Sequence, residues 1–207
     1  MNILVLGATG PTGREVMRQA LAAGHRVTAF VRDPAKLAGE SGMRVVQGDP
    51  ASSAELDAVL PGHDAVVSAL GRRASFRSER LIIRCMRALA PAMERRGVRR
   101  LVLVSAFGVG ESRRDVPPLM RLLQSVLLRD IFADKARAER YLRSRHLDWT
   151  FVYPTALTNG PLSGKYRAGE RLALRGFPKI SRADVAHFVL AALDTPAWVG
   201  KTVVVSD

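Results

Sequence analysis

The residues best suited to chemistry lie in a glycine-rich segment near the start of the chain. An apolar run, Asn2–Leu6, precedes three glycines at a spacing of three, Gly7, Gly10 and Gly13, and the helix-like segment Arg14–Ala23 follows them. This order places free backbone N–H groups and the positive end of a helix dipole where they can bind a pyrophosphate. The segment therefore predicts a dinucleotide-binding turn rather than a plain strand-to-helix connection.

Each small residue of this turn has a role in the prediction. The first glycine permits the tight turn, the second lets the main chain approach the phosphates, and the third leaves room for the helix to pack on the strand. Pro11 suits the first helical position, which needs no N–H partner. Thr9 and Thr12 add hydroxyl donors.

The remaining chain alternates between strand-like and helix-like runs. Further strands are expected at Arg26–Val31, Met43–Gln47, Asp64–Ser68, Arg99–Val104, Asp148–Tyr153 and Lys201–Val205. Further helices are expected from a Ser52–Glu55 capping box to Leu60, and at Phe76–Arg96, Asp134–Arg145 and Ser181–Leu193. The pattern predicts one α/β domain over residues 1–207, a Rossmann fold with a doubly wound parallel sheet and a small hairpin-like insertion at Pro161–Pro178 on the substrate side.

Composition limits the class of protein. The chain has 207 residues, of which 47% are hydrophobic, enough for a sizeable core. No apolar run has membrane-spanning length, no basic leader is visible, and the single cysteine, Cys85, fits a small buried side chain. The four histidines are isolated, so no metal site is expected. These observations favour a cytoplasmic protein without a membrane partner.

The formal net charge of +13 raises the question of nucleic acid. The basic residues are mostly arginines spread over many segments, and only 6% of the residues are aromatic. A solvated basic surface is the favoured interpretation, with no specific nucleic-acid partner. Such a surface still attracts a polyanionic cofactor or acidic substrates.

Strand ends supply the other candidate cofactor contacts. The second strand ends at Arg32, whose guanidinium suits the 2′-phosphate of NADP, so NADP is favoured while NAD stays open. A second interpretation makes Arg32 one more surface arginine. Asp49 is a candidate acceptor for the adenine amino group, or part of an Asx turn. The neighbouring candidates are Pro50, beneath the adenine, and Ala69, Leu70 and Gly71, beside the riboses. Arg73 is a candidate contact to the phosphates, although a solvent-exposed position is favoured for it.

Several segments together resemble a known family. They are Gly7–Gly13, Val31–Asp33, Gly48-Asp49, Ser105–Phe107, Pro117-Pro118, Pro161–Gly164, Ile180–Asp184 and His187-Phe188. The chain resembles the atypical short-chain dehydrogenase/reductases of the biliverdin reductase B, flavin reductase and NmrA-like group. The resemblance implies that the arginine after the second strand selects NADP. It also implies that the segment carrying Ser105 lines the nicotinamide, with cofactor contacts expected from Val104, Ser105, Ala106, Tyr153, Pro154 and Ala156.

The chain departs from the classical enzymes in its proton donor. Those enzymes carry Tyr-x-x-x-Lys, but Ile131 stands four residues before Lys135. Lys135 and Ser105 are the candidate catalytic residues, the lysine on the nicotinamide ribose and the serine on the carboxamide or the substrate. A surface position for Lys135 and a purely local hydrogen bond for Ser105 are the alternatives. Ala156 replaces the histidine of the biliverdin reductase B pattern, which argues against a tetrapyrrole substrate.

These observations favour an NADPH-dependent reductase that transfers hydride to a flavin, a quinone or a similar planar acceptor. The alternatives are a redox sensor that binds NADP(H) without turnover, and a sugar-nucleotide or isoflavone-type reductase or epimerase. Apolar residues over Leu119–Leu128 favour a core-facing helix, with a lid or a self-association surface as alternatives. The chain is expected to be a monomer or a weak homodimer.

Overall fold

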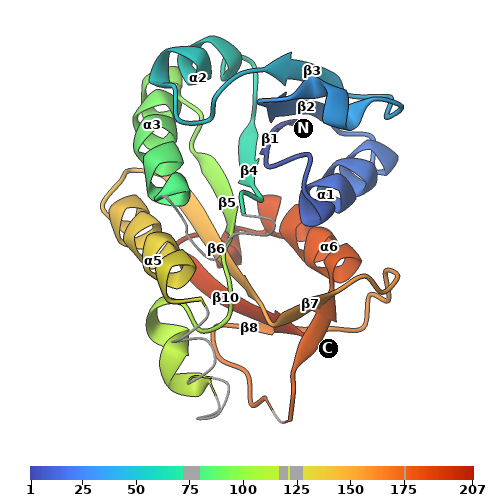
Figure 1. Ribbon diagram of the computed structural model, residues 1–207, viewed down its shortest axis with the longest axis vertical. Coiled ribbons are helices and arrows are strands. Elements are labelled where there is room, and N and C mark those ends of the chain that lie inside the picture. The colour runs from blue at the N-terminus through green and yellow to red at the C-terminus, as the bar shows by residue number, and fades with distance from the viewer. Residues whose placement is uncertain (72–79, 117–120, 122–127, 175) are drawn as a thin grey trace.

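A central sheet organises the molecule (Figure 1). The computed structural model describes residues 1–71, 80–116, 121, 128–174 and 176–207. In this described part, eight strands pair in the order β3-β2-β1-β4-β5-β6-β10-β8, and every pairing is parallel except that of β8 with β10. The strands are β1 (Asn2–Leu6), β2 (Arg26–Val31), β3 (Arg44–Gln47), β4 (Ala65–Ser68), β5 (Arg100–Val104), β6 (Asp148–Pro154), β8 (Arg167–Gly169) and β10 (Lys201–Ser206).

Helices cover both faces of this sheet. In Figure 1, α2 (Ser53–Val59), α3 (Leu81–Arg96) and α5 (Arg129–Arg143) lie on one face, and α1 (Pro11–Ala22) and α6 (Arg182–Leu193) lie on the other. Short 3₁₀ helices, η1 (Pro34–Leu37), η2 (Gly110–Asp115) and η3 (Pro196–Trp198), lie in the connections. The order of strands and the two helical layers confirm the predicted doubly wound Rossmann fold.

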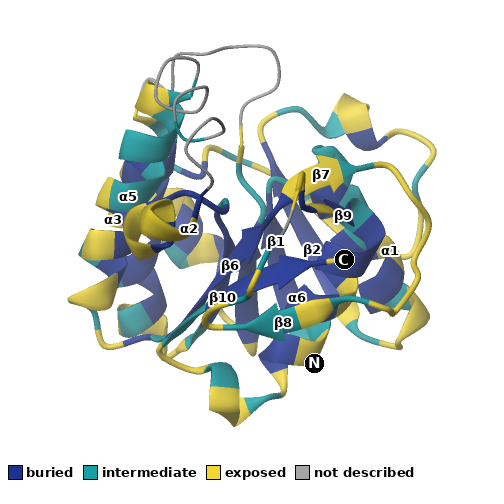
Figure 2. Cartoon of the chain, turned by 90° about the horizontal axis from the view of Figure 1, so that it is seen from below, coloured by how far each residue is buried: buried dark blue, intermediate teal, exposed yellow. Residues whose placement is uncertain are grey.

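Successive side chains of each strand point to opposite faces of the sheet, so two hydrophobic cores form, one on each face. Leu4 and Leu6 of β1 pack in the core beneath α2, α3 and α5, whereas Ile3 and Val5 pack in the core beneath α1 and α6. All four side chains are fully buried. Because both faces of the inner strands are covered, continuous apolar sequence is stable there, and Figure 2 shows these strands as buried over most of their length.

All seven strands expected from the sequence are present, with ends within one residue of the expectation. Three short strands were missed: β7 (Ala156–Thr158), β8 and β9 (Lys179–Ser181). The hairpin expected at Pro161–Pro178 is wrong for the described residues, because β8 joins the edge of the main sheet beside β10 instead of pairing within its own segment. Outside this sheet, β7 pairs with β9. A three-residue strand has too little pattern of its own to be recognised from sequence.

Several helix boundaries differ from the expectation, and α1 begins at Pro11, three residues before the expected start. Helix α5 begins at Arg129, five residues before the expected start, so Lys135 lies within the helix and not at its first turn. Helix α3 is described from Leu81, and residues 76–79 of the expected helix lie outside the described residues. The expected apolar face over residues 119–128 also lies outside them, apart from Arg121 and Leu128.

Side chains that cap helices fix the elements around the site. Ser52 accepts the Glu55 N–H at 3.4 Å, but the Glu55 carboxylate accepts from the Asp49 N–H at 2.9 Å, so the expected capping box is only half formed. At the start of α6, Ser181 accepts the Asp184 N–H at 2.9 Å. Asp134 of α5 is fully buried and caps another helix. Its carboxylate accepts the N–H groups of Ile82 and Ile83 in the first turn of α3, at 2.9 and 3.1 Å.

Candidate cofactor and hydride-transfer site

The glycine turn is closed so tightly that side chains are excluded from it. The Gly10 N–H donates to the Gly7 carbonyl at 3.0 Å, and Gly7 has a φ of +78°. A Cβ on Gly7 would lie 2.6 Å from the Ala69 carbonyl carbon, and one on Gly13 would lie 2.2 Å from the Gly7 carbonyl oxygen. Helix α1 begins at Pro11, so the N–H groups of its first turn have no acceptor within the helix. The turn therefore has the closeness and the free amides that a pyrophosphate requires.

A cleft of about 480 Å³ opens from this turn across the carboxyl ends of β1, β2 and β4. Nine residues expected at the cofactor line it: Gly7, Thr9, Gly10, Arg32, Asp49, Pro50, Ala69, Leu70 and Gly71. The parallel register brings them together, since Leu6 pairs with both Phe30 and Ser68, so these three strands end at one level. The cleft has the position at which an open α/β sheet binds a nucleotide.

Basic side chains line the end of the cleft beyond β2. Arg32 and Lys36 come from this end, and the lining of the whole cleft also includes Arg84 of α3 and the carboxylates of Asp33 and Asp49. The carboxylate of Asp33 accepts the Ala35 N–H at 3.2 Å and lies 3.3 Å from the Lys36 ammonium, so it is held by its own turn. This end of the cleft is therefore positively charged, which suits an additional phosphate better than ribose hydroxyls alone.

Asp49 makes the local turn that its sequence allows. Its side chain accepts the Ala51 N–H at 2.9 Å, as in an Asx turn, and the residue also lines the cleft. Both interpretations of Asp49 made from the sequence are thus compatible with its position.

The sequence analysis missed several residues of the cleft, above all Lys36 and Arg84. Lys36 lies four residues after Arg32 on η1, and Arg84 lies in the first turn of α3, which follows the end of β4 in the chain. A search for cations near each strand end would have found both. Arg73, expected near the phosphates, lies outside the described residues.

A second group of polar residues surrounds the end of β5. The Lys135 ammonium donates to the carbonyl of Val104 at 3.3 Å. Burial of the ammonium lowers the pKa of Lys135 to about 8, and the nearby carboxylates of Glu139 and Asp134 oppose this shift. Lys135 is thus half-buried and hydrogen-bonded to the main chain rather than fully exposed.

Ser105 follows β5 and is buried, and its hydroxyl donates to Glu139 Oε1. The hydroxyl of Tyr153, from β6, donates to Glu139 Oε2. The sequence analysis missed Glu139, although it lies four residues after Lys135 on the same helix face. Ser105, Lys135 and Glu139 thus form one cluster with Tyr153, whose ring is buried in the core.

The other expected contacts are distributed around these two groups. Pro11, Thr12 and Gly13 form the first turn of α1. Val104 and Ala106 flank Ser105, Pro154 ends β6, and Ala156 is exposed at the start of β7. None of these seven residues is part of the described lining of the cleft. The residues expected at the adenine, such as Asp49 and Pro50, line the cleft, whereas Ser105 and Lys135, expected at the nicotinamide, do not.

Comparison with known proteins decides the family. A family model described as NAD(P)H-binding matches residues 7–196. This chain belongs to that NAD(P)H-binding family. The match spans the glycine turn, the cleft and the Ser105 cluster, and it confirms the resemblance seen in the sequence motifs. The family binds NADP(H) or NAD(H) as its coenzyme.

Named relatives include reductases and one assembly factor. A (4-alkanoyl-5-oxo-2,5-dihydrofuran-3-yl)methyl phosphate reductase from Streptomyces griseus is 32% identical and aligns with 99% of this chain and 67% of its own length. The photosystem II assembly factor Ycf39 from Synechocystis is 28% identical over 98% of this chain, which spans only 61% of Ycf39. The solved structure of ChuY, an anaerobilin reductase from Escherichia coli O157:H7, has the same fold, with a TM-score of 0.81, 23% identity and coverage of 99% and 96% of the two chains.

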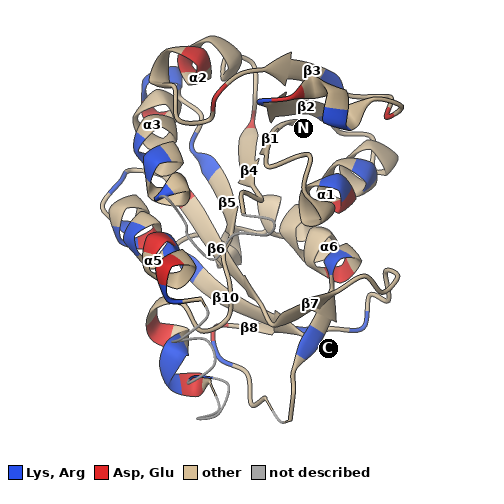
Figure 3. Cartoon of the chain, viewed as in Figure 1, with Lys and Arg blue, Asp and Glu red and all other residues tan. Residues whose placement is uncertain are grey.

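Other expectations concern single residues and surfaces. Cys85 is fully buried, and burial raises its pKa to about 12, which confirms a packed side chain rather than a reactive thiol. Lys and Arg residues occur on helices of both layers (Figure 3). Among the described residues, no group of three His, Cys, Asp or Glu side chains is placed to hold a metal ion. None of the described helices combines the length and the apolar character needed to cross a membrane.

Proposed function

We propose that the protein is an NADPH-dependent reductase that transfers hydride to a flavin, a quinone or a similar planar, electron-poor acceptor. The coenzyme supplies the hydride, and the chain binds and orients it. In this proposal the glycine turn binds the pyrophosphate, Asp49 and Pro50 contact the adenine, and Lys135 and Ser105 hold the nicotinamide end. The Streptomyces relative, a reductase by name, supports turnover rather than binding alone.

The observation that carries the choice of NADPH is the basic end of the cleft, where Arg32 and Lys36 lie beside an Asp33 carboxylate held by its own turn. In an NAD site, an acidic residue at this strand end binds the ribose hydroxyls. Here the guanidinium of Arg32 is the group available for the 2′-phosphate of NADPH.

The test exchanges this charge and compares the two coenzymes. Arg32→Asp is expected to weaken NADPH binding by about 10- to 150-fold, the value of a charge-assisted hydrogen bond of about 1.5–3 kcal/mol, and to change NADH binding far less. Arg26→Asp is the matched control, because Arg26 is an exposed arginine at the opposite end of the same strand. Calorimetric titration measures both affinities. Equal losses for NADPH and NADH would contradict the assignment of Arg32.

Steady-state oxidation of NADPH with FMN, riboflavin and a small quinone tests the acceptor. The planar acceptor requires no tyrosine donor, which agrees with Ile131 at the position where the classical enzymes have one. FMN and riboflavin differ by one phosphate, so their comparison also tests whether this chain shares the phosphate-bearing class of substrate in the Streptomyces relative's name.

The second candidate is a protein that binds NADP(H) and signals to a partner without turnover. Ile131 stands where the classical enzymes carry their tyrosine proton donor, and this absence favours binding without turnover. The relationship to Ycf39, an assembly factor by name, favours it as well. Tight NADPH binding with no oxidation by any of the three acceptors would support this candidate and exclude the reductase.

A further inference from the structure

Glu139 is a buried carboxylate with no ion pair in the described part of the chain. Only 3% of its surface is exposed. A carboxylate in such a place is costly unless it is paired or hydrogen-bonded. Its two oxygens bind one hydroxyl each, from Ser105 and from Tyr153. These contacts connect the buried carboxyl group directly to Ser105, a candidate residue of the site.

The surroundings of Glu139 favour a proton on its carboxyl group. Burial raises the pKa of Glu139 above its ordinary value, against the hydrogen bonds from Ser105 and Tyr153. On its own helix, the charges of Lys135 and Arg143 also oppose the shift.

The other charged side chains that line the same cavity as Glu139 come from η2, from residue 121 and from α5: Glu111, Arg113, Arg114, Arg121, Arg140 and Arg143. Glu111 acts on Tyr153, and the pKa of that tyrosine is raised, chiefly by burial and by Glu139. Tyr153 therefore keeps its proton and can only donate to Glu139 or turn its hydroxyl to accept. Tyr153 is only 1% exposed and its hydroxyl is held by Glu139, so of the two hydroxyls we assign the one on Ser105 to the nicotinamide end of the proposed site.

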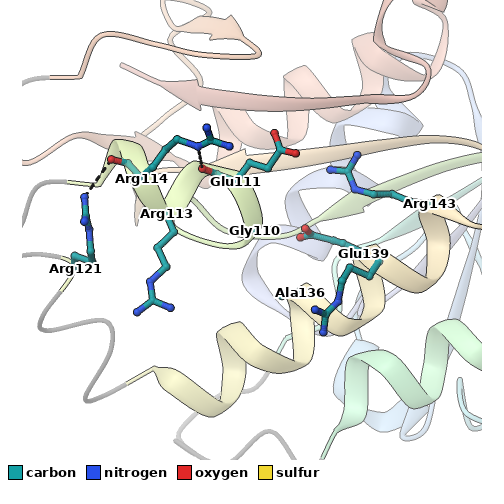
Figure 4. A pocket seen from close by; sticks show the side chains of 9 residues that line it. Gly110, Glu111, Arg113, Arg114, Arg121, Ala136, Glu139 and Arg143 are labelled. Carbon is teal, nitrogen blue, oxygen red and sulfur yellow. Dashed lines mark hydrogen bonds between the residues drawn. The ribbon is translucent and has the colours of Figure 1, made fainter.

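Glu139 also faces a route to water. It lines a cavity of about 690 Å³ between α5 and η2, together with Ala136 and Gly110 (Figure 4). A Cβ on Gly110 would lie 3.1 Å from the Tyr153 hydroxyl and 3.4 Å from Glu139 Oε2. Gly110 has a φ of +54°, so its backbone conformation also favours glycine. The bare backbone of Gly110 leaves this side of the carboxyl group open to small molecules of solvent.

We propose that Glu139 is the proton reservoir of the reductase and acts through Ser105, in the place of the missing tyrosine. The inference rests on the proposed function. The acceptor gains a hydride from the coenzyme and one proton from the Ser105 hydroxyl. Ser105 Oγ takes the proton of the Glu139 carboxyl group, which becomes a carboxylate. Water in the cavity then returns one proton to Glu139, and the site is restored.

Glu139 does not touch the acceptor in this scheme and is a positioning residue. The hydroxyl of Ser105 can rotate, so it can donate to the acceptor while its oxygen accepts from Glu139. When Glu139 is ionised, the hydroxyls of Ser105 and Tyr153 both donate to it, and when Glu139 is protonated, its own O–H can donate to Ser105 Oγ across the same contact. Lys135, bound to the Val104 carbonyl, stays free of the relay.

The test measures the rate of NADPH oxidation against pH in the wild type and in Glu139→Gln and Ser105→Ala. In the wild type, the rate is expected to fall as pH rises through the raised pKa of Glu139, because only the protonated acid supplies the proton. Glutamine keeps the size but cannot release a proton, so the part of the pH dependence that comes from Glu139 should vanish and the rate at low pH should fall about 100-fold. A fall in rate near pH 8 should remain in both proteins, because Lys135 titrates there. Glu139→Asp should restore a titrating profile.

The control is Glu111→Gln, which removes the other carboxylate that lines the same cavity and should leave the profile unchanged. Infrared spectroscopy of the protein without coenzyme gives a second readout, because a protonated carboxyl band should titrate above pH 4.5 and be absent in Glu139→Gln. Thermal unfolding shows whether each variant is folded.

The outcomes separate the relay from the function on which it rests. A titrating profile and infrared band that are lost in Glu139→Gln and kept in Glu111→Gln support the relay. NADPH oxidation in Glu139→Gln with the wild-type profile would overturn the relay and leave the reductase intact. No oxidation by the wild type with any acceptor would overturn the reductase, and the relay with it.

Discussion

Replacing Asp134 with alanine is expected to destabilise the protein, because both hydrogen bonds of its carboxylate go to the backbone of α3. Asp134 is fully buried on α5, and its carboxylate accepts two N–H groups in the first turn of α3. The N-cap residue of α3, Arg80, makes no side-chain cap hydrogen bond. Asp134 therefore supplies from another helix what an N-cap side chain normally supplies from its own.

The magnitude follows from these two contacts. A hydrogen bond to a charged group contributes about 1.5–3 kcal/mol, and loss of a helix cap costs about 0.5–2 kcal/mol. Two contacts that share one carboxylate and one helix end are not additive, so Asp134→Ala should lower the free energy of unfolding by about 2–4 kcal/mol. For a domain of this size, the melting temperature should fall by roughly 4–16 °C.

Urea denaturation followed by far-ultraviolet circular dichroism measures this loss. Asp130→Ala is the matched control, because Asp130 is exposed in the first turn of the same helix, and its loss should cost less than about 1 kcal/mol. A loss below about 0.5 kcal/mol in Asp134→Ala would refute the view that α5 caps α3.

Two further predictions concern the glycine turn and the start of α6. Gly13→Ala should abolish coenzyme binding in calorimetry and lower the melting temperature, because its Cβ would lie 2.2 Å from the Gly7 carbonyl oxygen; unchanged binding would contradict the tight turn. Burial acts to raise the pKa of Asp184, but hydrogen bonds from Ser181, Gly164 and Ser163 outweigh it and hold the pKa below its ordinary value of 3.8. Because the folded state lowers this pKa, Asp184 contributes stability at neutral pH that is lost as pH falls below about 4, and Asp184→Asn should remove that part of the pH dependence of unfolding. A wild-type pH profile of stability in this variant would show that Asp184 is not responsible.

Features that depend on neighbours in the chain could be predicted from the sequence. The glycine spacing specifies a turn that only residues without side chains can form, and the structure shows the contacts that exclude a Cβ at Gly7 and Gly13. Buried parallel strands are continuous apolar runs, so β1, β4 and β5 were recognised with nearly correct ends. The order of these elements then leaves few topologies for the sheet.

Features that depend on contacts between distant segments were decided only by the tertiary structure. The role of Glu139 depends on its hydrogen bonds with Ser105 and Tyr153, which come from other parts of the chain. The role of Asp134 depends on its hydrogen bonds to the first turn of α3. Neither carboxylate can be distinguished in the sequence from an exposed acid on a charged helix, because burial and partners are properties of packing. The sequence by itself determined a coenzyme-binding α/β domain, since turn geometry and strand periodicity are local. Only the tertiary structure decided which acidic side chains are buried and which groups they hydrogen-bond. Burial and hydrogen-bond partners depend on which distant segments the sheet brings together.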